Sequence, residues 1–426
     1  MMKYQIPRGT YDILPEQSYK WQKVISAFRE LAAAFGYEEI STPVFEQAAL
    51  FERSSGESSD VVKKEMYRFS DQKGRQFALR PEGTAPVARA YLENRLDIGS
   101  AVRKLYYIGP MFRYDRPQAG RYRQFQQYGI EFIGSDNPFY DAEVISILWL
   151  YLSGLGLAKL RLELNSVGCA NCAKDYDKAL QEYFQPHVAE LCPDCQLRIG
   201  LKPRRLLDCK VKACKDIARG APSQLDYLDE PCQIHFAATQ RHLELMQVPF
   251  TINPRIVRGL DYYTNTAFEI VSEGLGAQNS LAGGGRYNGL LEQIGGKSIP
   301  AIGFAGGFER LLLALEEEKV SLGQAPVPDV FVIPMGTAAQ EFILPYLNDL
   351  RKAGVYAEYD PDKNSFKAQL KAADNSQARH ALIIGETELA RKSAILKDLS
   401  SGEQLTYPLE PLSELISALR RRSPVH

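Results

Sequence analysis

Residues 66–132 constrain the fold most, because they read as a series of strands separated only by short turns. The strand-like runs are broken by DQKGR, RPEGT and RPQAG, each of which contains the Gly, Pro or Asp residues typical of turns. Breaks this short join antiparallel neighbours, since a parallel crossover needs a dozen or more residues. The sequence therefore predicts an α+β fold built on an antiparallel sheet rather than on repeated βαβ units.

A second stretch interrupts this strand pattern. Residues 17–36 and 140–152 show helical periodicity of apolar residues, and strand-like, Gly-rich segments return from residue 257 onward. Between them, residues 168–248 are richer in Lys, Arg and helix-forming residues. We expect residues 1–325 to form one domain that contains residues 168–248 as a small, mostly helical insertion.

The C-terminal part of the chain follows GQAPVPDV, a linker rich in Pro and Gly. After this linker, the short apolar runs VFVIP, VYAEYD and ALIIG alternate with helical segments that start at residue 338 and at residue 366. This alternation is typical of a small parallel-sheet domain. We expect residues 327–426 to fold separately as an α/β domain.

The overall charge says little about binding partners. The 51 Lys and Arg residues are balanced by 52 Asp and Glu residues, so a polyanion would have to bind to local patches. The N-terminus lacks an apolar signal core, and the longest apolar stretch, which begins at Val144, is too short and too interrupted to span a bilayer. We expect a cytoplasmic protein without a membrane segment.

All cysteines lie between Cys169 and Cys232. Four of them form two CxxC pairs, CANC and CPDC, a pattern that suits a tetrahedral zinc site with thiolate ligands. The ligands predicted for this structural zinc are Cys169, Cys172, Cys192 and Cys195. The alternative is that the cysteines are reduced, partly buried thiols in an intracellular protein.

The segment MFRYDRPQAGRYRQFQQYGIEF, residues 111–132, places several arginines in a strand-like pattern. Because alternate residues share one face of a strand, this face should carry cations, an aromatic ring, an amide and a carboxylate. These residues are Arg113, Arg121, Arg123, Phe125, Gln127 and Glu131. Guanidinium groups bind phosphates and Phe can stack on a base, so the face suits a nucleotide with a polar small molecule. The alternative is an exposed hairpin whose arginines pair with Asp115 and Glu131.

Glycine-rich loops of the phosphate-binding kind are incomplete in this chain. GGKS at 295–298 resembles the end of such a loop, but the position of the first required glycine holds Leu291. Glycines 283–285 therefore need another explanation, and close approach of the backbone to a ligand or tight packing is the physical reason we expect.

The chain as a whole resembles the histidyl-tRNA synthetases, a family of class II aminoacyl-tRNA synthetases. The resemblance rests on RGTYDILP, ALRPEGTAPVAR, the segment at 111–131, RGLDYY, AGGGRYNGL and GFAGGFERL, which occur in the order of the family. It implies a catalytic domain with an antiparallel sheet over residues 1–325 and an anticodon-binding domain over residues 327–426. The implied reaction is ATP-dependent ligation of L-histidine to tRNA(His) through a histidyl-adenylate, with Mg²⁺ accompanying ATP.

The same resemblance implies roles for individual residues. Arg113 and Arg258 would be catalytic. ATP would be bound by Arg113, Arg121, Phe125 and Arg310. Histidine would be bound by Glu82, Thr84, Gln127, Glu131, Arg258, Tyr262, Tyr263 and Tyr287. Arg116 and Gln118 would meet the acceptor end of the tRNA, and the segment EISTPVFEQAALF would build the interface of a homodimer.

Three other functions fit parts of this pattern. The first is a non-catalytic, histidine-binding regulatory subunit of histidine biosynthesis, but relatives of that kind typically lack the RGLDYY arginine and the C-terminal domain. The second is a synthetase for another amino acid of the same subgroup, which would need other residues at Glu131 and in LDYY. The third is an RNA-binding module without catalysis, which would not need the acidic residues Glu82 and Glu131.

Overall fold

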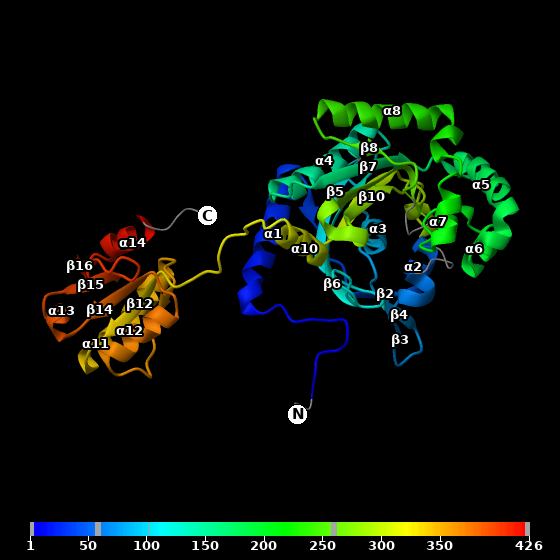
Figure 1. The fold of residues 1–426 in the computed structure, drawn as a ribbon. Coiled ribbons are helices and arrows are strands. Elements are labelled where there is room, and N and C mark those ends of the chain that lie inside the picture. Colours follow the sequence, from blue (N-terminus) through cyan, green and yellow to red (C-terminus); the bar gives the residue numbers. More distant parts are fainter. Residues whose placement is uncertain (1–3, 56–60, 101, 257–261, 422–426) are drawn as a thin grey trace. The chain divides into compact units, whose positions relative to one another are not determined.

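The protein divides into two compact units, residues 1–322 and 323–426. A computed structural model describes residues 4–55, 61–100, 102–256 and 262–421 (Figure 1). We describe each unit by itself. No helix among these residues is both long enough and apolar enough to cross a membrane.

The first unit is built on a sheet with the strand order β1-β5-β6-β11-β10-β9-β7-β8. Its strands are β1 (Glu38–Glu39), β5 (Arg103–Phe112), β6 (Gln124–Ile133), β7 (Leu160–Ser166), β8 (Thr251–Ile252), β9 (Thr264–Ser272), β10 (Ser280–Arg286) and β11 (Ala301–Gly307). The inner strands from β5 to β7 pair antiparallel, whereas β1 and β8 join the edges in parallel. The predicted antiparallel sheet is therefore confirmed.

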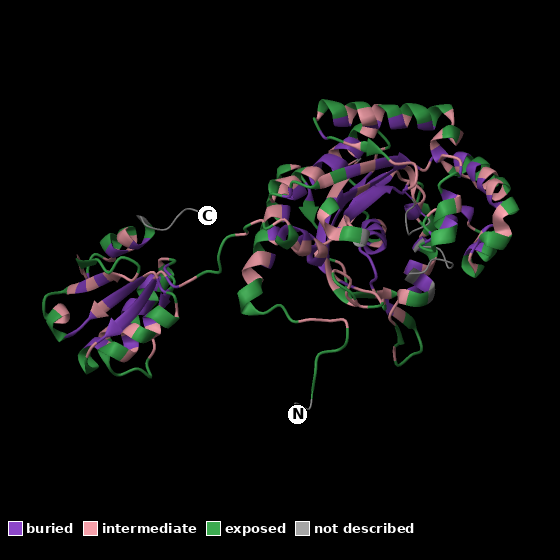
Figure 2. Cartoon of the chain, in the orientation of Figure 1, coloured by how far each residue is buried: buried purple, intermediate pink, exposed green. Residues whose placement is uncertain are grey.

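One face of this sheet is covered by three helices, α1 (Pro15–Ala34), α4 (Pro138–Gly154) and α10 (Phe308–Glu317), which share the largest apolar core with the strands. In α1, the buried residues Trp21, Val24, Phe28 and Ala32 recur at helical spacing. Figure 2 shows the central strands as the most continuously buried part of the unit. This packing leaves the opposite face of the sheet available for a cavity.

Between β1 and β5 lie α2 (Ala48–Ser55), η1 (Val61–Glu65), α3 (Thr84–Glu93) and a small antiparallel sheet of β2 (Phe45–Gln47), β3 (Arg68–Ser70) and β4 (Gln76–Leu79). Residues 66–132 were predicted to be strands and turns, but α3 lies within them and starts inside RPEGT. The helix begins there because the Glu82 carboxylate accepts hydrogen bonds from the backbone N–H groups of Thr84 and Ala85, at 2.6 and 3.0 Å.

The insertion between β7 and β9 is mostly helical. Its elements are α5 (Ala170–Phe184), η2 (Gln185–Glu190), α6 (Pro193–Arg198), η3 (Pro203–Leu206), α7 (Lys212–Ala218), η4 (Gln224–Tyr227) and α8 (Glu230–Leu245). The elements from α5 to α7 enclose a small core of their own, whereas Phe236 and Leu243 of α8 belong to the main core. The insertion thus consists of a small helical subdomain and one helix that packs on the sheet unit.

Arg286, at the end of β10, is fully buried and binds Asp141 of α4. Its Nε lies 2.9 Å from each carboxylate oxygen and its Nη2 lies 2.7 Å from Oδ2. The guanidinium also donates to the backbone carbonyls of Ser135 and Asn137, at 3.0 and 3.1 Å. His235 of α8 contacts the same carboxylate at 3.2 Å. One buried carboxylate therefore connects a strand of the sheet, a covering helix and the insertion.

The second unit is a five-stranded sheet with helices. Its strands, in the order β13-β12-β14-β15-β16, are β12 (Val330–Pro334), β13 (Ala357–Glu358), β14 (His380–Ile384), β15 (Ser393–Asp398) and β16 (Gln404–Pro408). Its helices are α11 (Thr337–Lys352), α12 (Phe366–Asn375), α13 (Glu386–Ala390) and α14 (Leu412–Arg421). The first three strands are parallel as predicted, but β15 and β16 pair antiparallel, so the sheet is mixed. The sequence pattern predicted no strand after ALIIG, so the β15–β16 hairpin was not expected.

Removing the charge of Asp141 should strongly destabilise the first unit. Asp141→Asn leaves the Arg286 guanidinium buried without its counter-ion, which costs about 3–5 kcal/mol. The measurement is urea unfolding of the full chain followed by tryptophan fluorescence, because Trp21 and Trp149 are the only tryptophans of the sequence and both lie in this unit.

Glu93→Gln is the matched control, since Glu93 pairs with Arg89 on the surface and should contribute less than about 1 kcal/mol. Equal losses for Asp141→Asn and Glu93→Gln would contradict the proposed importance of the buried pair.

Candidate active site

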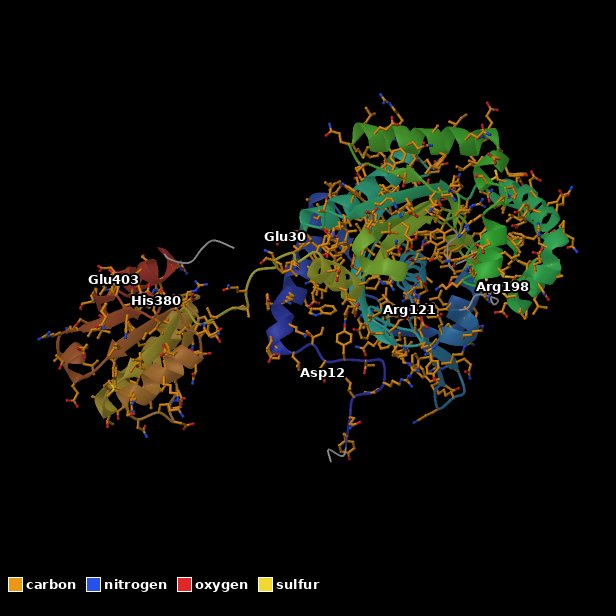
Figure 3. All side chains as sticks on the ribbon, viewed as in Figure 1. Asp12, Glu30, Arg121, Arg198, His380 and Glu403 are labelled. Carbon is orange, nitrogen blue, oxygen red and sulfur yellow. The ribbon has the colours of Figure 1, made fainter. Side chains whose placement is uncertain are left out.

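A cavity of about 290 Å³ lies on the sheet face opposite α1. Its walls come from α3, the β5–β6 hairpin, the start of β9, and β10, β11 and α10. Most of the predicted site residues line it: Glu82, Thr84, Arg113, Arg121, Phe125, Gln127, Tyr262, Tyr263, Tyr287 and Arg310. Figure 3 labels Arg121 among the side chains of this unit. The structure thus brings together residues that are distant in the sequence.

Glu131 is almost completely buried and is not itself a lining residue, but its carboxylate lies directly behind Thr84, Tyr287 and Gly303, which do line the cavity. Its carboxylate accepts hydrogen bonds from the Thr84 hydroxyl, at 2.7 Å, and from the Tyr287 hydroxyl. Burial raises the pKa of Glu131 to about 8, against the opposing effect of these two donors. A carboxyl in this setting is poised to accept a hydrogen bond or a positive charge from a ligand.

Gly303 makes room for the Glu131 side chain. The two residues are direct partners on β11 and β6, and a Cβ at Gly303 would clash with Glu131 Oε2 and with the carbonyl oxygen of Ile130. On the next strand, a Cβ at Gly284 would likewise clash with the Gly303 carbonyl oxygen and with Phe304. Tight packing was one of the two reasons expected for glycines 283–285, and it explains why position 284 holds glycine.

Glu82 and Gln127 line the cavity wall beside Glu131, and Tyr107 is buried next to Gln127. Glu82 is buried, and burial raises the pKa of its carboxyl although two backbone N–H groups and the Arg113 charge act in the opposite direction. The Tyr107 hydroxyl lies 3.2 Å from Gln127 Oε1. This end of the cavity is therefore lined by carboxylates, an amide and hydroxyl groups, which suits a ligand that carries donors.

The opposite end of the cavity is the arginine-lined end, where three arginines lie together with the carboxylates of Asp115, Glu269 and Glu309. The Arg113 guanidinium carbon lies 5.4 Å from the centroid of the Phe125 ring. Arg310 Nη1 donates to the Ser280 carbonyl at 2.8 Å, and the pKa of Arg310 is lowered by burial and by the neighbouring charges of Arg121 and Arg113. Three arginines that repel one another in a partly buried site favour the binding of an anion.

The hairpin does not follow the predicted alternation as far as Arg121 and Arg123. Strand β6 begins only at Gln124, and the residues before it form a loop with one isolated bridge between Gln118 and Arg121. Arg123 stacks 4.1 Å above the ring centroid of Tyr114 and does not line the cavity. The prediction that it shares a face with Phe125 was wrong, because a face is shared only where the backbone is extended.

The alternative of a purely salt-bridged hairpin is only partly correct. Arg121 pairs with Asp115 at 3.0 Å, as that alternative supposes. Glu131, however, contacts Thr84 and Tyr287 rather than an arginine. Arg116 and Gln118 lie in the same loop and outside the cavity lining. Arg258 falls in residues 257–261, outside the described residues.

Three acidic residues that line the cavity, Glu65, Glu269 and Glu309, were not predicted. Glu269 of β9 accepts a hydrogen bond from the Ser280 hydroxyl. Glu309 of α10 accepts from the Tyr11 hydroxyl, at 2.5 Å, and from the Gln126 N–H, at 2.7 Å. Glu269 could have been found from the sequence, since it is the one charged residue in the apolar run AFEIV.

The four cysteines predicted to bind one zinc ion do not lie together. Cys192 and Cys195 cluster with Cys209 and Cys214, whereas Cys169 and Cys172 cluster with Cys232 and Asp229. The prediction of one site from the two CxxC pairs was therefore wrong. Sequence spacing showed which cysteines are close neighbours along the chain, but tertiary packing decides which pairs meet.

The antiparallel sheet, its covering helices and a cavity lined by carboxylates, tyrosines and three arginines fit the catalytic domain of a class II aminoacyl-tRNA synthetase. The family model described as "Histidyl-tRNA synthetase" matches residues 9–190 and 201–311, and the model described as "Anticodon binding domain" matches residues 329–419. The chain belongs to the histidyl-tRNA synthetase family. Members of this family use ATP and Mg²⁺.

Individual relatives agree with this assignment. The "Histidine--tRNA ligase" of Pelotomaculum thermopropionicum is 48% identical over 404 residues, which cover 95% of each chain. The "Histidine--tRNA ligase" of Caldanaerobacter subterraneus is 46% identical over 97% of this chain and 100% of that protein. Among solved structures, apo histidyl-tRNA synthetase of S. aureus has a TM-score of 0.83 at 40% identity, covering 97% of this chain and 99% of that chain.

A methyl group at Gly303 should disturb the floor of the cavity. Gly303→Ala places a Cβ against Glu131 Oε2 and the Ile130 carbonyl, so we expect a loss of about 1–3 kcal/mol from overpacking. Gly154→Ala is the control, because that glycine ends α4 with no atom within 4 Å of its added Cβ. Urea unfolding measured by tryptophan fluorescence compares the two. Indistinguishable midpoints would show that the floor is not tightly packed.

Proposed function

We propose that this chain ligates L-histidine to tRNA(His) in two steps, with histidyl-adenylate as the intermediate and AMP and pyrophosphate as products. The observation that carries the proposal is that one cavity gathers Glu82, Thr84, Gln127 and tyrosines at one end and three arginines with the Phe125 ring at the other. An amino acid suits the first of these ends and a nucleotide suits the second. Binding both in one cavity brings the reacting atoms together.

The acidic end is the proposed histidine site. Glu131 would accept a hydrogen bond from the imidazole N–H, with Tyr287 holding the carboxylate in place. Tyr262 and Tyr263 would complete the imidazole pocket, and their rings pack with centroids 4.9 Å apart. The α-ammonium group would be bound by Glu82, Thr84 and Gln127, which line the same wall.

The arginine-lined end is the proposed ATP site. Arg113 would bind the α-phosphate, Phe125 would stack on adenine, and Arg121 and Arg310 would bind the outer phosphates. Glu269 supplies oxygen ligands of the type that Mg²⁺ prefers, and it lies close enough to Arg310 to influence that residue's pKa. Bound Mg²⁺ would neutralise part of the phosphate charge.

The reaction requires no protein nucleophile, because the histidine carboxylate itself attacks the α-phosphorus. Two anions must approach each other, so the contribution of the chain is to position them and to stabilise the charge that develops. Arg113 would do this from the cavity wall and Arg258 from residues 257–261. The terminal ribose hydroxyl of the tRNA then attacks the adenylate.

The tRNA and a second copy of the chain are the proposed macromolecular partners. Arg116 and Gln118 lie in the loop before β6 and would meet the acceptor end, while the C-terminal unit would read the anticodon. An exposed aromatic cluster supports a homodimer: Phe45, within EISTPVFEQAALF, contacts Phe69 and Phe77 with ring centroids less than 6 Å apart. The proposed activity belongs in the cytoplasm.

The regulatory-subunit alternative is less well supported. The two relatives described above are named as ligases, and each aligns with this chain over nearly its full length. The chain also retains the RGLDYY arginine and a C-terminal anticodon-binding match, which the sequence analysis identified as the distinguishing features.

The test of the function is charging of a tRNA(His) transcript with labelled histidine by the full chain. We expect ATP-dependent incorporation into this transcript and none into a transcript for another amino acid. Histidine binding without incorporation would instead support the regulatory alternative.

Glu131 should determine selectivity for histidine. Glu131→Gln keeps the size of the side chain but weakens its acceptor, so it should raise the KM for histidine at least ~10-fold, as expected for one hydrogen bond to a charged group. The KM for ATP should change little. Equal changes in both constants, measured by ATP–pyrophosphate exchange, would mean that Glu131 only supports the hairpin.

Arg258 should act mainly in the transition state. If it contacts both the histidine carboxylate and the α-phosphate as they approach, Arg258→Ala should lower kcat for adenylate formation at least ~10²-fold while KM changes little. Arg258→Lys should rescue poorly, because one ammonium cannot engage two anions in a planar fork. Exchange within a few-fold of wild type in a folded variant would exclude the catalytic role.

A further inference from the structure

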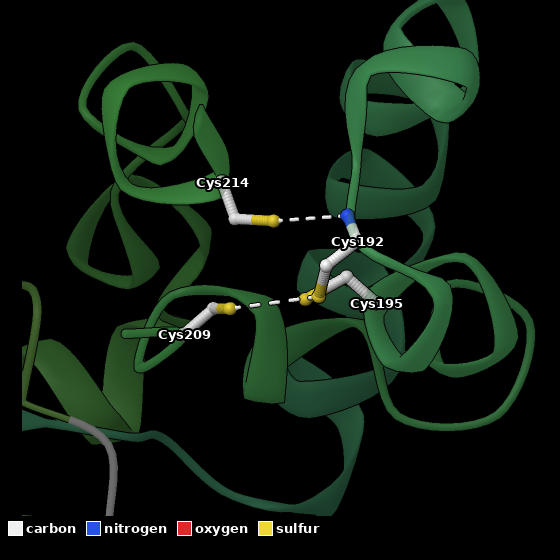
Figure 4. Close-up of side chains that lie close together, drawn as sticks. All are labelled: Cys192, Cys195, Cys209 and Cys214. Carbon is white, nitrogen blue, oxygen red and sulfur yellow. Dashed lines mark hydrogen bonds between the residues drawn. The ribbon is translucent and has the colours of Figure 1, made fainter. Parts of the chain in front are cut away.

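Four cysteine sulfurs converge inside the insertion (Figure 4). The Sγ atoms of Cys192, Cys195, Cys209 and Cys214 all lie within 4.8 Å of one another, and Cys192 Sγ is 3.9 Å from Cys209 Sγ. Zinc–sulfur bonds of about 2.3 Å place the sulfurs of a tetrahedron about 3.8 Å apart. The four thiols therefore lie close to the positions that a single zinc ion requires.

These sulfurs come from separate segments of the insertion. Cys192 precedes α6 and Cys195 lies within it, Cys209 follows η3, and Cys214 lies in α7. The backbone N–H of Cys192 donates to Cys214 Sγ at 3.2 Å, an interaction that also stabilises a thiolate. The spacings, C-x₂-C and C-x₄-C, fall within the range of structural zinc sites.

The surrounding subdomain has few other sources of stability. Its helices α6 and α7 contain six and seven residues, lengths at which an isolated helix is not stable in water. The core that joins them to α5 consists of a few large apolar residues, among them Tyr176, Leu180 and Phe184, together with three of these cysteines. Small domains of this kind commonly depend on a metal or disulfide.

We propose that Cys192, Cys195, Cys209 and Cys214 bind one structural Zn²⁺ as a tetrathiolate site. Binding replaces the thiol protons, which pass to the solvent, and involves no change of oxidation state. Because sulfur fills all four positions, the ion has no open site for a substrate and serves to fix α6 to α7 and to the segment after η3. The inference does not depend on the proposed tRNA ligase activity.

The second group provides an internal control. Asp229 caps α8 by accepting from the Cys232 N–H at 3.0 Å, and the Cys169 thiol donates to the same carboxylate at 3.1 Å. These polar groups already satisfy one another. Cys169→Ser/Cys232→Ser therefore removes two thiols from the insertion without altering the proposed zinc ligands.

The experiment measures metal in the full chain by inductively coupled plasma mass spectrometry after purification and dialysis against metal-free buffer. We expect at least one zinc per wild-type chain and retention of one zinc in Cys169→Ser/Cys232→Ser. Adding Cys209→Ser to this background should lower the zinc content at least ~10-fold. A second measurement on the wild-type chain is a titration of free thiols without reductant. It is carried out before and after acid releases the zinc.

Several results would overturn the proposal. Wild-type chain with well under one zinc equivalent, or with iron in its place, would exclude the zinc site whether or not the variants fold. Zinc lost from the control variant, or retained after Cys209→Ser, would assign the metal to other ligands. A free-thiol count that stays at three of the seven cysteines after acid treatment would indicate that the four proposed ligands form disulfides.

Discussion

The buried pair of Arg286 and Asp141 is the interaction on which the rest of the catalytic unit depends. Two fully buried charges would be costly apart, but together with the carbonyls of Ser135 and Asn137 they satisfy one another. The pair fixes the end of β10 on α4, and Tyr287 is the next residue in the chain. The position of the Tyr287 hydroxyl beside Glu131 is therefore determined by an ion pair that faces away from the cavity.

The floor of the cavity follows from the same arrangement. Glu131 enters the site from β6, and it can do so only because its neighbour on β11 is Gly303. Burial raises the pKa of Glu131 to about 8. A hydrogen bond or a positive charge from a ligand therefore contributes more binding free energy at this carboxyl group than at an exposed one. Packing, charge and selectivity are thus linked through one residue.

Sequence patterns predicted local features better than tertiary ones. The alternation within the hairpin correctly brought Phe125 and Gln127 to the cavity, because these residues lie in regular β6 structure, but it failed for Arg123 in the preceding loop. The helix α3 was missed because its start depends on a cap by Glu82. The grouping of cysteines was also wrong, since no spacing rule tells which of two CxxC pairs meets Cys209 and Cys214.

The central claim is that a single cavity activates histidine with ATP. The most direct measurement is ATP–pyrophosphate exchange by the full chain, without tRNA, for each of the standard amino acids in turn. The account predicts exchange that depends on histidine and is close to background with every other amino acid, because the proposed pocket disfavours side chains that place no donor of the imidazole's shape against Glu131. Exchange supported equally by another amino acid, or no exchange with histidine by the folded chain, would contradict it.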